Sequence, residues 1–266
     1  MTGTCRLCQQ PKKQLQVSHL LAAAFYKSMR EPADKNPNPI TVNPKVALKT
    51  SRQVSDYLLC AACEDRFNTG GERWILKNCW QSERDFPLQT VLLGAKPIYK
   101  SRDQFTIYEG ARIAGIDMEK LIYFAASIFW RAGAHQWGPV GREDSVKLEL
   151  GPYEEELRLF LMSSGHFPAN MVLIVTVSSS TEAGRNQFLT FPFLKDHKAE
   201  FRQYKFVIPG VTFQMFTGKG MRDSLRGLCT VRSPKHRIYT SPTMDEMNLS
   251  DMAKMAANAR ALGDLK

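Results

Sequence analysis

Two short cysteine motifs decide how this chain is organised: CRLC at residues 5–8 and CAACE at residues 60–64. In each motif the two residues between the cysteines allow a turn that brings both sulfurs to one side. Four such sulfurs match the soft donors and tetrahedral geometry that zinc prefers. The motifs therefore predict a structural zinc site with the ligands Cys5, Cys8, Cys60 and Cys63. The alternatives are iron–sulfur ligation and four buried thiols that share a spacing by chance.

The 51 residues between the motifs can hold more than a turn, and they include His19, the only histidine of the first 134 residues. Residues 30–44 contain four prolines, which predicts a long loop that is mobile or contacts substrate. We expect short strands at 15–17 and 57–59. A helix should begin at Glu64, break near Gly70-Gly71 and resume over 72–76.

Length and composition indicate a globular protein of one large or two ordinary domains. The chain has 266 residues, of which 43% are hydrophobic and 23% charged, as in ordinary globular proteins. It lacks an apolar run of about 18 residues, so we expect no membrane span. The polar start and the position of Cys5 argue against a secretory signal. Six cysteines in a chain of this length favour a reducing compartment, and we expect the cytoplasm.

The net charge of +10 favours a polyanionic partner, nucleic acid first. Residues 1–84 hold 13 Lys and Arg against 7 Asp and Glu, and residues 85–266 hold 23 against 19. A second basic stretch, 195–237, is interleaved with aromatic residues and would suit phosphate contact and base stacking if the rings were exposed. If the rings instead face a core, the stretch is an ordinary set of strands. These rings belong to Phe201, Tyr204, Phe206, Phe213 and Phe216.

The pattern of residues 85–266 predicts an α+β region with an antiparallel sheet and two inner helices. A helix from Asp117 to about Ala134 has apolar residues nearly all round and should be buried. Pro209-Gly210 predicts a hairpin turn between two strands. Further helices are expected at 152–162 and 250–262. Strands are expected at 91–93, 97–99, 105–108, 171–177, 187–191, 204–208, 211–216 and 227–231.

A histidine at a strand end, two cysteine knuckles and a helix after the second knuckle together resemble the ββα-metal nucleases of the HNH and endonuclease-seven type. The resemblance covers about residues 1–80. It implies a zinc-stapled treble-clef domain, here residues 1–84, followed by an α+β substrate- or partner-binding domain, 85–266. The motifs Ser18-His19 and CAACE are also similar to those of a group of bacterial and phage HNH-like proteins. In that group, a glutamate at the position of Glu72 recurs, as does a helix with a sequence similar to Phe129-Trp130-Arg131.

The resemblance implies site residues as well. His19 would be the general base that takes a proton from water attacking a phosphodiester. Glu64 would bind a catalytic Mg²⁺ or Mn²⁺, assisted by Asn68 or Asn43. Ser18 stands where the family has an acid, which removes one charged ligand. Taken without the resemblance, Glu64 can be an acid placed at a helix N-terminus, and Trp130-Arg131 a core aromatic beside a surface or ion-paired arginine.

Two functions follow as hypotheses. The first is a metal-dependent HNH-like endonuclease that hydrolyses DNA in preference to RNA, in a phage-defence or mobile-element setting. The second is a treble-clef zinc module without catalysis that binds nucleic acid or a partner protein. The missing acid at Ser18 supports the second.

Overall fold

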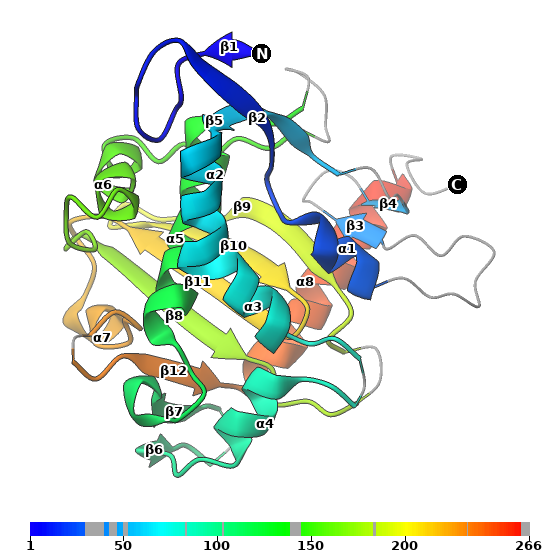
Figure 1. The fold of residues 1–266 in the computed structure, drawn as a ribbon. Helices are drawn as coiled ribbons and strands as arrows, with labels where there is room; N and C mark the ends of the chain where they lie inside the picture. Colours follow the sequence, from blue (N-terminus) through cyan, green and yellow to red (C-terminus); the bar gives the residue numbers. More distant parts are fainter. Residues whose placement is uncertain are drawn as a thin grey trace.

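The protein is seen here in a computed structural model that contains two β-sheets and the helices packed between and around them (Figure 1). The smaller sheet has three strands in the order β1-β2-β5. The larger has nine, in the order β4-β3-β9-β10-β11-β8-β12-β7-β6. The structure describes residues 1–29, 40–42, 47–49, 53–82, 84–102, 104–138, 145–182, 185–232 and 234–261.

The small sheet and the helix after it form a ββα unit that presents the cysteine motifs. Strand β1 (Thr2–Gly3) pairs with β2 (Lys13–His19), and β2 pairs antiparallel with β5 (Ser55–Cys60). The β2–β5 register shifts between Gln16 and Val17. This irregularity lets both Leu15 and Ser18 face inward although they are three residues apart. Helix α2 (Ala61–Phe67) follows β5 directly.

The expected break at Gly70-Gly71 does not occur. After α2 the chain continues as one π-helical turn, η1 (Asn68–Glu72), and then as α3 (Arg73–Asn78). A Cβ on Gly71 would lie 2.6 Å from the Lys120 carbonyl oxygen and 2.8 Å from Phe124 Cβ. Gly71 therefore allows α5 to pack closely against this helix. A rule that treats glycine only as a helix breaker does not predict this packing role.

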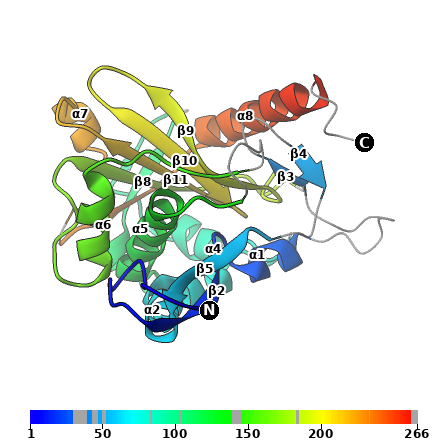
Figure 2. The ribbon, with the colours of Figure 1, turned by 90° about the horizontal axis from the view of Figure 1, so that it is seen from above.

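Helix α5 (Met118–Ala134) lies at the centre of the molecule, as its apolar pattern predicts. The Asp117 side chain accepts from the Lys120 N–H at its start. Phe124 packs against Phe206 and Phe213 of the large sheet, with ring centroids 6.3 and 5.7 Å apart. Figure 2 shows α5 and the ββα unit on one side of the large sheet and α8 (Pro242–Ala261) on the other.

The large sheet is mainly antiparallel. Two of its pairs, β12–β8 and β3–β9, are parallel. Its long strands lie close to the expected ranges, and Gly210 turns between β10 and β11 with φ +76°. Strand β3 comes from residues that separate the two cysteine motifs, so this segment contributes to the large sheet. The strands are β3 (Ile40–Val42), β4 (Ala47–Lys49), β6 (Tyr99–Lys100), β7 (Thr106–Glu109), β8 (Met171–Val177), β9 (Leu189–His197), β10 (Arg202–Ile208), β11 (Val211–Thr217) and β12 (Arg237–Thr240).

Three further expectations about local structure are wrong. Residues 91–93 end helix α4 (Pro87–Leu93), because Pro87 starts a helix and Leu88 and Leu92 bury one face. Residues 227–231 form no strand. Instead, Thr230 is hydrogen-bonded to β8. Its backbone N–H donates to the Leu173 carbonyl, and its hydroxyl oxygen accepts from the Val175 N–H. The last helix begins at Pro242, eight residues earlier than expected.

The remaining elements flank the core. Helices α1 (Ala23–Ser28), α6 (Tyr153–Leu161) and α7 (Asp223–Arg226) and the 3-10 turn Gly110–Arg112 complete the described part of the chain. A single hydrophobic cluster joins buried residues of 1–84, such as Phe25 and Phe67, to those of 85–266, such as Phe124. Among the residues described, no helix has the length and apolar character needed to cross a membrane.

Candidate metal centre

The first cysteine motif forms a tight turn at the start of the chain. The Gln9 N–H donates to the Cys5 carbonyl at 2.8 Å, and the Cys5 N–H donates to the Gln10 carbonyl at 3.1 Å. Gln9 adopts φ +58°, the left-handed conformation that lets the chain reverse so sharply. The turn leaves the sulfurs of Cys5 and Cys8 on the same side.

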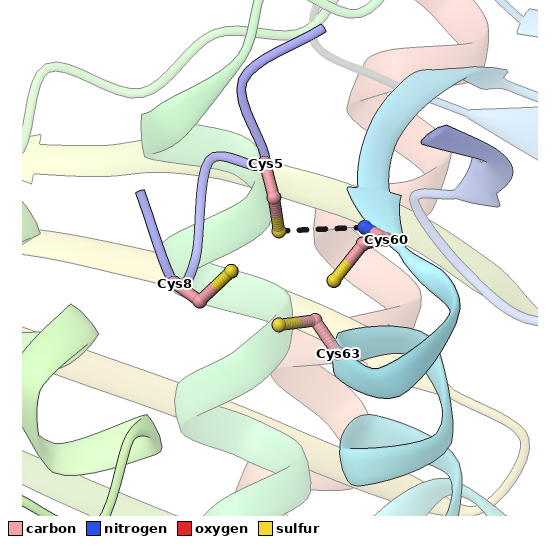
Figure 3. Close-up of side chains that lie close together, drawn as sticks. All are labelled: Cys5, Cys8, Cys60 and Cys63. Atoms are coloured by element: carbon pink, nitrogen blue, oxygen red, sulfur yellow. Dashed lines mark hydrogen bonds between the residues drawn. The ribbon is translucent and has the colours of Figure 1, made fainter. Parts of the chain in front are cut away.

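The second motif stands where β5 runs into α2. Cys60 is the last strand residue and the N-cap of α2, and Cys63 lies in the first turn of that helix. The Cys60 N–H donates to Cys5 Sγ at 3.3 Å, which ties the two motifs together (Figure 3). This backbone geometry aims Cys63 at the sulfur of Cys60 and at the first motif.

The four sulfurs converge on one point. They lie within 4.8 Å of one another, and three of the four cysteines are buried. Figure 3 shows the side chains pointing inward from two separate stretches of chain. Four sulfurs at about 2.3 Å from a central ion would be about 3.8 Å apart, so a small contraction suffices. The cluster could hold a metal such as zinc, and the predicted grouping of these cysteines is confirmed.

The electrostatics of the cluster fit a cation. A hydrogen bond from the Cys63 thiol lowers the pKa of Cys5 to about 4. The reverse effect of Cys5 raises the pKa of Cys63, and burial raises that of Cys8. The sulfurs therefore compete for negative charge. A divalent ion at their centre would remove the competition, because its charge stabilises each thiolate.

Beside the cysteines, the structure brings Ser18 and Glu64 together. The Ser18 hydroxyl, fully buried on β2, donates to Glu64 Oε1 on α2. Sequence reasoning singled out both residues, 46 positions apart. Their contact shows that the Ser-His motif and the CAACE motif share one site.

Arg131 of α5 completes a polar network at this place. Its guanidinium pairs with Glu72 and lies 3.9 Å from Glu64, while its side chain is only 1% exposed. It also stacks over the Phe67 ring, 4.6 Å from the centroid. Trp130 is a core residue edge-on to Phe67. The interpretation of Trp130-Arg131 as a core aromatic beside an ion-paired arginine is therefore confirmed.

The other predicted site residues are not joined to this network. His19 is half-buried at the end of β2, paired in register with Ser55. Within the described ranges, neither its ring nor the side chain of Asn68 has a hydrogen bond or an ion pair. Asn43 lies outside the described residues. The role that the resemblance implies for His19 therefore stays a prediction.

The residues present do not fit the catalytic Mg²⁺ or Mn²⁺ that the resemblance implies. Glu64 accepts a hydrogen bond at one oxygen and faces a guanidinium at the other. Glu72 is occupied by the same arginine. Apart from the four cysteines, the described residues contain no three His, Cys, Asp or Glu side chains gathered as a metal requires. We derive no step through such an ion.

Sequence reasoning missed a second group of polar residues near the metal centre. His135, just after α5, contacts Asp56 of β5, with 2.9 Å between Nε2 and Oδ2. Arg6, inside the first motif, donates to the carbonyl of Ala134. No spacing joins these residues in the chain, since only the packing of α5 on the ββα unit assembles them.

The basic stretch 195–237 does not form a stacking surface from its rings. Four of its five aromatic residues are buried, and the fifth, Phe201, is half-buried and packs on Phe216 with 5.5 Å between ring centroids. Lys205 is buried against Asp251, and Lys195 pairs with the same carboxylate. These side chains serve the sheet and its contact with α8.

Comparison of the chain with protein-family models, with curated proteins and with solved structures finds no match.

Proposed function

We propose that this chain is a zinc protein of the treble-clef type that binds nucleic acid, with duplex DNA as its ligand. The carrying observation is the network of Ser18, Glu64, Arg131 and Glu72 beside the four cysteines. It occupies the place where the resemblance to ββα-metal nucleases puts a catalytic ion. In this proposal, the ββα unit resembles that class in the order of its elements, and the Arg131 guanidinium lies where the class would bind the ion.

Zinc suits the cysteine cluster better than other common ions. Four cysteine sulfurs in a closed, mainly buried site form the donor set of structural zinc, and every position is taken by protein. Bound there, zinc would supply structural stability to the ββα unit. The contact of β5 with the first motif, through the Cys60 N–H and Cys5 Sγ, supports the proposed treble-clef arrangement.

The charge of the chain supports a polyanionic ligand. The net charge is +10, and two acidic residues that follow the second cysteine motif, Glu64 and Glu72, are engaged internally by Arg131. A basic surface attracts the phosphate backbone without regard to sequence, and bound cations are released as it docks. We therefore expect the protein to bind the phosphate backbone of DNA rather than to recognise its bases.

The test uses the zinc-loaded full chain and a short fluorescent DNA duplex. We expect one zinc per chain and a log affinity that falls linearly as log salt rises. We also expect supercoiled plasmid to stay intact with Mg²⁺ or Mn²⁺ added. An affinity that does not change between low and moderate salt would contradict backbone binding.

One observation favours a second candidate, an HNH-like endonuclease with His19 as the base. The half-buried His19 ring follows Ser18 directly and has no partner among the residues that the structure describes. An imidazole without a hydrogen-bond partner has a nitrogen available to act as a general base. Here the expectation is plasmid cleavage by the wild type and a loss of about 10²–10⁴-fold in His19→Ala. His166→Ala, at an exposed position, is the control. Cleavage that depends on His19 would replace the first proposal by the second.

A further inference from the structure

The C-terminal end of α5 is covered by donors from three other stretches of chain. The last four carbonyls of a helix have no partner inside it. Here the Arg131 carbonyl accepts from Trp137 Nε1 at 2.8 Å, and the Ala132 carbonyl accepts from the Leu148 N–H at 2.8 Å. Lys147 Nζ donates to the Gly133 carbonyl. Arg6 donates to the Ala134 carbonyl through Nη2 at 2.8 Å and Nε at 3.3 Å.

This end of the helix carries more positive charge than capping needs. The C-terminus of a helix is equivalent to about half a negative charge. Two full cations, Arg6 and Lys147, meet it on neighbouring carbonyls, and both residues are exposed to solvent. Within the described part of the chain, neither is paired with a carboxylate. Arg6 Nη1 and the remaining Lys147 protons are left for another acceptor.

His135 stands at the same place in a fixed orientation. It follows Ala134 directly, and its Nε2 faces Asp56 Oδ2 at 2.9 Å. The other Asp56 oxygen accepts the Tyr57 N–H at 2.7 Å, which holds the carboxylate still. The imidazole also meets the buried Trp137 ring edge-on, 5.0 Å between centroids. Nδ1 is then the nitrogen left for a ligand, and it donates to an anion when the ring carries a proton on each nitrogen.

We propose that Arg6, His135 and Lys147 form a phosphate-binding site for the DNA backbone at the junction of the first cysteine motif, β5 and α5. The inference rests on the proposed function and names the surface that performs it. Arg6 lies between Cys5 and Cys8, so a metal held by these cysteines fixes the guanidinium in place. The ligand is a phosphodiester, recognised by charge and by a forked donor.

The test compares Arg6→Gln, His135→Gln and Lys147→Gln with the wild type in duplex binding over a range of salt. Removing one phosphate contact should lower the salt slope by about 0.9 for each cation lost. Arg6→Lys should keep the slope, because the charge remains. Lys254→Gln is the matched control, since Lys254 is exposed on α8 across the large sheet. Zinc content and the thermal midpoint of each variant show whether it is folded.

The outcomes of this test distinguish a failure of the phosphate site from a failure of the proposed DNA binding. If the wild type binds duplex and all three variants keep its slope, DNA lies elsewhere and the inference is wrong. If the wild type binds no duplex, titration with inorganic phosphate, followed by the NMR signals of the His135 ring, decides. If phosphate shifts the His135 signals in the wild type but not in Arg6→Gln, the phosphate site is supported and the proposed DNA binding is wrong. An unchanged His135 signal removes both.

Discussion

Every residue of β8 and β11 is buried, whereas in α2 only Cys63 and Phe67 are. The large sheet and α5 are held by apolar burial, which stabilises in proportion to the area removed from water. The ββα unit buries far fewer aliphatic side chains of its own. Its side chains form instead a cluster of four cysteines that could hold a metal, a polar network and a contact with α5. Two regions of one chain thus use different forces.

Three arginines join the two regions. Arg6 of the first motif bonds the end of α5, and Arg158 of α6 donates to the Leu7 carbonyl at 2.7 Å. Arg131 of α5 engages Glu64 and Glu72 around α2. Each guanidinium presents several donors in a rigid fork, so it can meet carbonyls or carboxylates of another region. A metal held by the cysteines and this junction would therefore make two separate contributions to the stability of the ββα unit.

The largest effect is expected from Cys60→Ser, which breaks the metal centre. Zinc binding by such sites is worth about 10–16 kcal/mol, which exceeds the stability of many whole domains. Zinc content should fall from one per chain to none. Hydrogen exchange should show β2 and α2 unprotected, while β8 and β11 stay protected.

Cys79→Ser is the matched control for this change. Cys79 is a buried thiol outside the cluster, so that variant should keep its zinc. A Cys60→Ser protein that retains both zinc and the protection of α2 would show that the four-cysteine site does not hold the unit together.

Next in size is Arg131→Met, which leaves two partly buried carboxylates without their cation. Breaking a buried ion pair on one side costs about 3–5 kcal/mol, measured as the free energy of unfolding in urea. Adding Glu64→Gln and Glu72→Gln to the same protein should recover much of the loss, since no charge is then stranded.

Lys198→Met serves as the comparison for Arg131, because Lys198 pairs with Asp196 in a contact whose side chains are 55% and 42% exposed. It should cost well under about 1 kcal/mol. Equal losses at positions 131 and 198 would mean that the network does not stabilise the junction.

A smaller effect is expected from Arg158→Gln. Losing its hydrogen bond to Leu7 should cost about 1 kcal/mol and weaken zinc retention against a chelator about fivefold. Glu155→Gln, which removes the exposed partner of Arg158 but leaves the bond to Leu7, should retain zinc like the wild type. Identical zinc retention in all three proteins would show that α6 does not support the first motif.

The smallest effect concerns the sheet region and acid. Burial raises the pKa of Asp245, whose Oδ2 accepts from the Ser179 N–H and hydroxyl. A carboxyl whose pKa is raised on folding contributes stability below its unfolded pKa and loses it as pH rises through the folded value. The stability advantage of the wild type over Asp245→Asn should therefore grow as pH falls from 7 toward 4. Parallel pH profiles of the two proteins in urea unfolding would contradict this.

Much of the large sheet could be predicted, because its signals are local. The apolar pattern from Asp117 to Ala134 specified a buried helix, and the runs at 171–177 and 211–216 specified buried strands. The wrong predictions concern segments where a residue pattern with a local interpretation in fact reflects packing against a distant part of the chain. Gly70-Gly71 signals a break, yet the helix continues because α5 packs against these glycines. Val91-Leu92-Leu93 suits a strand, yet Pro87 and the spacing of Leu88 and Leu92 make it a helix.

The sequence by itself predicted the grouping of Cys5, Cys8, Cys60 and Cys63, because a two-residue spacing turns both sulfurs of each motif to one side and two such motifs supply the four donors that zinc prefers. It also identified Ser18 and Glu64 as members of one site. Only the tertiary structure placed Arg131 between Glu64 and Glu72, and His135 and Arg6 together at the end of α5. The physical reason is that ion pairs between distant positions have no periodicity in the sequence. They form only after apolar packing has set α5 against the ββα unit.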